Sequence, residues 1–64
     1  MEFSKMKSID SGLKFKTVGN LMVETTGITE HLEETDLFVH EVKVLKGPGE
    51  GNIYLHNLDS AEQI

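Results

Sequence analysis

The chain has no cysteine, no arginine and no long apolar run. Without cysteine it can form neither a disulfide nor a zinc site of the cysteine type. Arginine supplies the bidentate contacts that proteins make to phosphates and bases, so its absence disfavours nucleic-acid binding. No apolar run approaches the roughly 20 residues of a membrane span, and residues 1–9 lack the apolar core of a signal peptide. We expect a cytoplasmic protein that does not enter a membrane.

Charge is divided unevenly along the 64 residues. Residues 1–23 carry four lysines and two acidic residues, whereas residues 24–64 carry two lysines and nine acidic residues, so that the whole chain has a net charge of −5. A net negative domain lacks the electrostatic footprint of a nucleic-acid-binding protein. The simplest interpretation is a solvated surface that keeps a small domain soluble.

Signatures of catalysis and metal binding are missing. The serines and threonines occur without a nucleophile-elbow motif. His31, His40 and His56 show neither HxH nor HExxH spacing, and they are predicted to lie on different segments or faces. A chain this short also has little room for both a core and a pocket of a few hundred Å³. We expect no enzymatic activity, no metal and no cofactor.

Two β-prone runs flank a Gly-Pro-Gly-Glu-Gly turn within residues 36–58, which predicts a hairpin. A four-residue loop around a type I turn with Pro48 at its second position would pair Gly47 with Asn52. The face predicted to be core then carries Phe38, His40, Val42, Val44, Ile53 and Leu55. The opposite face carries Leu37, Val39, Glu41, Lys43, Leu45, Tyr54, His56 and Leu58. A loop longer by one residue would place Val42 and Val44 with Tyr54 and His56 instead, and we favour it less because it buries more polar atoms.

Residues 42–51 resemble the strand and glycine turn of KOW-type motifs, which occur in SH3-like barrels of ribosomal and transcription proteins. The resemblance covers ten residues and lacks the basic residues and the further glycine and strand pattern of such motifs. It implies an SH3-like barrel and carries no functional residue over to this chain, because function belongs to sites and not to folds.

Residues 13–25 predict an earlier hairpin, which turns at Gly19 and Asn20. A three-residue loop with Asn20 in the left-handed conformation pairs Thr17 with Leu21. This register also opposes two further pairs, Phe15 with Val23 and Lys14 with Glu24. It adds Leu13, Phe15, Leu21 and Val23 to the predicted core.

Residues 26–35 are interpreted as a continuing strand with a bulge at Gly27 and a turn at residues 33–35, in preference to a helical turn behind Thr29. Residues 1–10 form an arm or short helix, and residues 59–64 a terminal turn with Asp59 as its N-cap and Glu62 as the reciprocal residue. Together these elements predict one all-β domain, residues 1–64, built as an antiparallel meander of four to five strands. An SH3-like partly open barrel is one form of that fold.

The predicted function is a non-enzymatic protein-interaction or regulatory module that binds a protein partner or a second copy of itself. Too many apolar groups lie on the second face of the later hairpin for a surface left in water, and such patches mark interfaces. The predicted contact residues are Leu37, Val39, Tyr54, His56 and Leu58. In a structural alternative, the sheet coils and the earlier hairpin or the arm with Phe3 and Met6 covers that face.

Two other functions are kept as alternatives. One is a nucleic-acid-binding barrel that uses Lys5, Lys7, Lys14 and Lys16. The other is an acidic inhibitor that imitates nucleic acid through Glu30, Glu33, Glu34 and Asp36. An ordinary solvated charge run explains this acidic group equally well.

Overall fold

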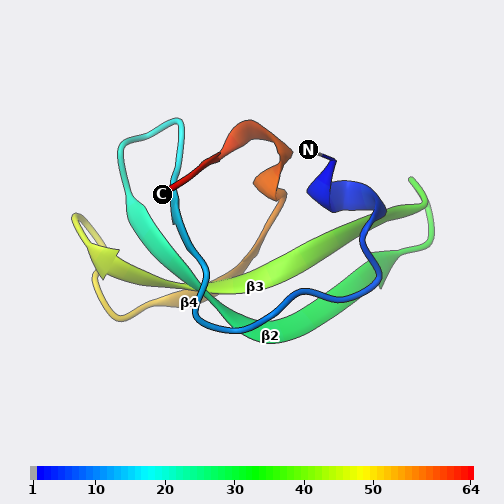
Figure 1. The fold of residues 1–64 in the computed structure, drawn as a ribbon, viewed down its shortest axis with the longest axis horizontal. Coiled ribbons are helices and arrows are strands. Elements are labelled where there is room, and N and C mark those ends of the chain that lie inside the picture. The colour runs from blue at the N-terminus through cyan, green and yellow to red at the C-terminus, as the bar shows by residue number, and fades with distance from the viewer. Residues whose placement is uncertain (1) are drawn as a thin grey trace.

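Alternating β-prone segments build a five-stranded antiparallel sheet with the strand order β4-β3-β2-β1-β5 (Figure 1). The computed structural model describes residues 2–64. Its elements are η1 (Phe3–Lys5), β1 (Lys14–Lys16), β2 (Met22–Leu32), β3 (Leu37–Lys46), β4 (Ile53–His56), η2 (Leu58–Ser60) and β5 (Glu62–Gln63). The predicted all-β antiparallel meander with short helical turns is confirmed, and the sheet is open, with β4 and β5 at its edges. None of the helices among the described residues has the length and apolarity needed to cross a membrane.

The β1–β2 hairpin has the predicted register. Phe15 lies opposite Val23, and Lys14 lies opposite Glu24 with its Nζ 3.5 Å from Glu24 Oε1. The Thr17 N–H donates to the Leu21 carbonyl, which closes the three-residue loop. Asn20 has a φ of 64°, the left-handed conformation that this loop requires. Local turn chemistry was therefore sufficient to predict this hairpin.

Strand β2 continues through the Thr-rich segment, as predicted, and turns back into β3 over residues 33–36. A register shift between Thr25 and Thr29 places the bulge at Gly27, whose φ is +92°. A Cβ atom at this position would lie 3.4 Å from Ser11 Cβ, so glycine allows both the backbone conformation and the close approach of residue 11. The bulge lets one long strand bend around the core.

The predicted register of the β3–β4 hairpin is wrong. Val42 lies opposite Tyr54 and His40 opposite His56, which turns Tyr54 and His56 toward the core side and leaves Ile53 and Leu55 57% and 40% exposed. Strand β3 extends to Lys46 because that residue still pairs with β2, so Gly47 is not free to close a tight turn. The chain returns through a longer loop, in which the Gly51 N–H donates to the Val44 carbonyl. Three loop glycines with positive φ make this wide turn possible.

The core is completed by the two chain ends. Its buried cluster comprises Phe3, Ile9, Phe15, Val23, Val42, Val44 and Leu58. The Phe3 ring packs edge-to-face on Phe15 with the ring centroids 5.1 Å apart. Leu13 and Leu21, which were predicted to be core residues, are partly buried against this cluster. Phe38 was also predicted to be a core residue, but it is not part of the cluster and stacks on His31 with the ring centroids 4.6 Å apart. The predicted N-terminal helical turn thus supplies a core residue rather than a free arm.

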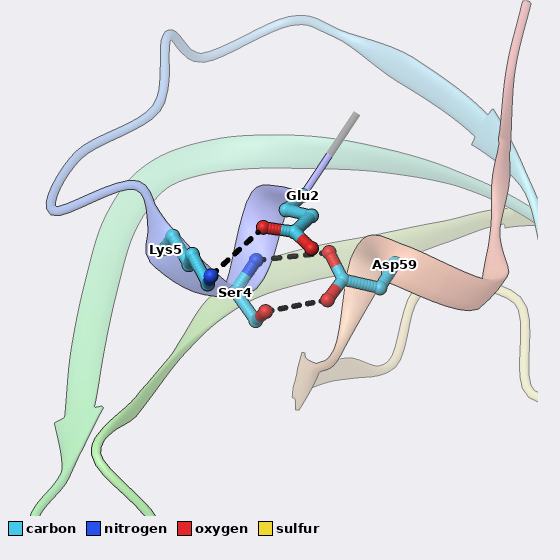
Figure 2. A network of polar contacts seen from close by, with 4 residues as sticks. All are labelled: Glu2, Ser4, Lys5 and Asp59. Atoms are coloured by element: carbon cyan, nitrogen blue, oxygen red, sulfur yellow. Dashed lines mark hydrogen bonds and ion pairs between the residues drawn. The ribbon is translucent and has the colours of Figure 1, made fainter.

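Hydrogen bonds from Ser4 to Asp59 join the two ends (Figure 2). The Ser4 N–H and the Ser4 hydroxyl donate to the two carboxylate oxygens of Asp59 over 2.9 and 2.5 Å. The predicted N-cap role of Asp59 is wrong, because Asn57 Oδ1 accepts the Asp59 N–H and caps η2. Glu62 is likewise part of β5, opposite Lys16, instead of completing a capping box. Asp59 is occupied by a contact 55 residues away in the chain, which local sequence patterns do not encode.

The observed register predicts losses of stability of different size for two leucines near the C-terminus. Leu58→Ala should lower the free energy of unfolding by about 2 to 4 kcal/mol, because Leu58 is fully buried and its loss leaves a cavity. Leu55→Ala should cost under about 1 kcal/mol in the monomer, because that side chain is 40% exposed on the other face. Urea unfolding at low protein concentration measures both, and a larger loss for Leu55→Ala would contradict the register.

The contact between Ser4 and Asp59 predicts a loss of stability in acid. The Ser4 hydroxyl and N–H hold the pKa of the Asp59 carboxyl below its usual value. Because the lowered pKa belongs to the folded state, the stabilisation is present above about pH 4 and is lost as the pH falls further. Ser4→Ala should remove about 1 kcal/mol at pH 7, a modest figure because solvent screens this exposed carboxylate, and little at pH 2.

Glu2→Gln is the matched control for that experiment. This substitution breaks the neighbouring ion pair, in which Lys5 Nζ lies 3.1 Å from Glu2 Oε2 and both side chains are exposed to solvent (Figure 2). We expect a change close to zero, because exposed ion pairs contribute little. Equal losses for the two variants at pH 7 would show that the Asp59 contact has no special role.

Candidate functional site

The sheet has one covered face and one uncovered face. Both helical turns lie on the same side of the ribbon that β2 and β3 form (Figure 1), and Phe3 and Leu58 pack there into the core. Directly opposed residues of antiparallel strands share a face. The pairs Leu32 with Leu37, Glu30 with Val39 and Glu41 with Leu55 therefore lie together on the opposite, outer face.

Six aliphatic side chains gather on this outer face, which we call the outer apolar patch. They are Ile28, Leu32, Leu37, Val39, Ile53 and Leu55. Ile28 belongs to this face because the adjacent Thr29 points inward, where its hydroxyl contacts the His40 ring. Four of the six are 40% to 57% exposed. Val39 is only 9% exposed and yet is not a member of the core cluster, so it lies within a second, shallow apolar group.

The structure divides the predicted contact residues between the two faces. Leu37 and Val39 lie on the outer face, as predicted. Tyr54 packs against the core, His56 lies opposite the buried His40, and Leu58 is fully buried, because the β4 register turns these residues inward. The five residues do not form one surface. The alternative prediction was that the N-terminal arm covers this face. It holds for Leu58, because η2, which contains Leu58, is in contact with η1.

Sequence reasoning missed four members of the patch, namely Ile28, Leu32, Ile53 and Leu55. In β4 the signal was present, because Ile53 and Leu55 alternate with Tyr54 and His56 and one pair had to face outward. The choice between the pairs depended on the loop length alone. In β2 the bulge at Gly27 concealed the alternation that places Ile28 and Leu32 on one side.

Charged residues border the patch at its two ends with opposite signs. The turn between β2 and β3 carries Glu33, Glu34 and Asp36, and Glu30 lies just before it. Asp36 Oδ1 is 2.8 Å from His31 Nε2, and a depression of about 450 Å³ at this turn is lined by His31, Leu32, Glu33, Glu34 and Thr35. At the other end of the strands the lysines prevail, with Lys14, Lys16, Lys43 and Lys46 around Glu24. The outer face is therefore electrically polarised along its strands.

His40 has a structural role. Its ring is fully buried, with Nε2 2.8 Å from the Phe3 carbonyl and Nδ1 2.8 Å from the Thr29 hydroxyl. Since a carbonyl only accepts, Nε2 carries the proton and donates to Phe3, and Nδ1 accepts from Thr29. Both ring nitrogens of His40 therefore have hydrogen-bond partners, and the contact with Phe3 ties η1 to β3. Within residues 2–64 no three potential metal ligands come together.

Comparisons with protein-family models, with curated proteins and with solved structures gave no match for this chain. Its function must therefore be inferred from the chemistry of its own surface. That surface offers contiguous aliphatic side chains between an acidic end and a lysine-rich end, an arrangement suited to a protein partner.

His56 predicts a second, separate sensitivity to acid. Its Nε2 is buried without a hydrogen-bond partner, and desolvation lowers the pKa of the ring below its usual value. The folded state therefore favours the neutral ring, so the stabilisation is present above about pH 6.5 and is lost as the pH falls through the lowered value. His56→Phe, which preserves a ring beside Tyr54, should flatten the stability profile between about pH 7 and pH 5. Urea midpoints across this range measure it, and a slope equal to that of the wild type would contradict the role of His56.

Proposed function

We propose that the chain is a non-enzymatic protein-interaction module that associates through the outer apolar patch. The observation that supports this most directly is the position of Val39. It is 9% exposed although it lies on the face opposite the core, which it shares with Leu37 and with the exposed Ile28, Leu32, Ile53 and Leu55. Contiguous apolar surface with a charged border is typical of an interface.

Association would also compensate for the small size of the domain. A chain of 64 residues without a disulfide obtains only a few kcal/mol from a single core. A partner that binds the folded state alone raises its stability by mass action. Burial of the patch contributes about 25 cal/mol for each Å² of apolar surface removed from water. Function and stability would thus have the same source.

The patch supports protein binding better than it supports the two alternative functions. For nucleic-acid binding, Lys5 and Lys14 are already paired with Glu2 and Glu24, and the chain has no arginine. For an acidic imitator, the turn at residues 33–36 is exposed, but its apolar neighbours have no counterpart in nucleic acid. The open five-stranded sheet is compatible with any of the three, because a fold does not determine function. A cytoplasmic location, compatible with the absence of cysteine, is part of the proposal.

Site-specific cross-linking tests the proposal even while the partner is unidentified. A photo-reactive amino acid at Ile53 should give a discrete adduct in cells that produce the protein. The matched control is the same amino acid at Val18, which is 79% exposed but lies in the β1–β2 turn, away from the patch. Leu55→Glu should abolish the adduct at Ile53 with the circular dichroism unchanged, because a charge in the patch would be desolvated on binding. No adduct at Ile53, or equal adducts at Ile53 and Val18, would overturn the proposal.

A further inference from the structure

We propose that the partner is a second copy of this chain, packed outer face to outer face with the strands of the two copies running in opposite directions. This inference rests on the proposed function. In this arrangement the acidic end of each copy lies over the lysine-rich end of the other. The polarity of charge along the outer face is the observation that selects it.

The two ends of the face carry net charges of opposite sign. The acidic end, Glu30 together with the turn at residues 33–36, carries four carboxylates. The lysine-rich end carries Lys14, Lys16, Lys43 and Lys46 against Glu24 and Glu62, a net charge of +2, and Glu41 lies between the two ends. The patch lies between the two ends. A single face thus contains both halves of a self-complementary surface, as a twofold symmetric dimer requires.

The twofold axis of a face-to-face dimer can run along the strands or across them, and charge distinguishes these two arrangements. A twofold axis parallel to the strands would superimpose the two acidic turns and the two lysine clusters, which repel. An axis across the strands places each acidic turn over a lysine cluster. The outer apolar patch lies between the two charged ends, so an axis across the strands near its middle also superimposes the two patches.

The area of the face fits a dimer of modest affinity. The molecule measures 30 × 20 × 19 Å along its principal axes, and the long axis follows the ribbon of β2 and β3 (Figure 1). A face no larger than 30 by 20 Å could bury at most on the order of 600 Å² on each copy, or about 1,200 Å² in total. This is the lower limit of a standard protein interface. Its apolar centre and charged border also match the usual anatomy of interfaces.

Charge reversal tests the arrangement in purified protein. Sedimentation equilibrium over a range of concentrations should show a dimer for the wild type. Lys43→Glu and Glu30→Lys should each raise the dissociation constant about tenfold or more, because symmetry makes every substitution act twice. An equimolar mixture of the two variants should dimerise as tightly as the wild type or more tightly, because each contact then joins opposite charges again.

Two controls alter the net charge by the same amount away from the outer face. Lys7→Glu and Asp10→Lys both lie before β1, at exposed positions. Neither should change the dissociation constant by more than about twofold at about 0.15 M salt, where distant exposed charges are screened. The circular dichroism of all four variants should equal that of the wild type. Comparable weakening by the controls would mean that net charge, and not the proposed contact, controls association.

The outcomes separate this inference from the proposed function. A purified wild-type protein that stays monomeric to millimolar concentration overturns the dimer. If cross-linking at Ile53 then captures a protein of different mass, the interaction surface still stands and only its occupant changes. A dimer that neither Lys43→Glu nor Glu30→Lys weakens also overturns the antiparallel arrangement. A monomer that in addition gives no adduct at Ile53 overturns both proposals.

Discussion

The fold depends on the packing of the two helical turns against one face of the sheet (Figure 1). Five strands take up much of a 64-residue chain, and the residues left over form two short helical turns and the loops. Both helical turns pack on the inner face, where Phe3 and Leu58 enter the core. Within residues 2–64, Ile28 and Leu32 of β2 and Ile53 and Leu55 of β4 stay exposed on the outer side of the sheet. The proposed association rests on this exposed patch.

Cover for the inner face depends on polar contacts that join distant parts of the chain. The buried His40 ring donates to the Phe3 carbonyl, and the Asp59 carboxylate accepts from Ser4. These contacts hold η1 against β3 and η2, where hydrophobic burial alone would leave the direction of the N-terminal segment undefined. His56, opposite His40, completes this region with an unpaired buried nitrogen. These two histidines thus serve the covered face, while the outer face relies on aliphatic groups and exposed charges.

Much of the fold could be predicted because its signals are local. The loop with Asn20 and the pairing of Phe15 with Val23 follow from turn chemistry and alternation, and the bulge at Gly27 was visible in the same way. The β3–β4 register was wrong because it depended on where β3 ends. Lys46 still pairs with Met22, so pairing with β2 determines where β3 ends. The length of the β3–β4 loop therefore depends on a neighbouring strand and not on the glycine turn alone.

For the candidate site, the sequence by itself determined that apolar residues exceed what one core face can hold, and that acidic residues and lysines lie in separate segments. It also placed Leu37 and Val39 on the outer face, because alternation within a single strand needs no partner. Only the tertiary structure decided that Ile53 and Leu55, and not Tyr54 and His56, join them there. The physical reason is that the side-chain period of a strand is two residues, so a slip by an odd number exchanges the faces of β4 completely. The pairing of β3 with β2 decided that slip, and β2 lies far from β4 in the sequence.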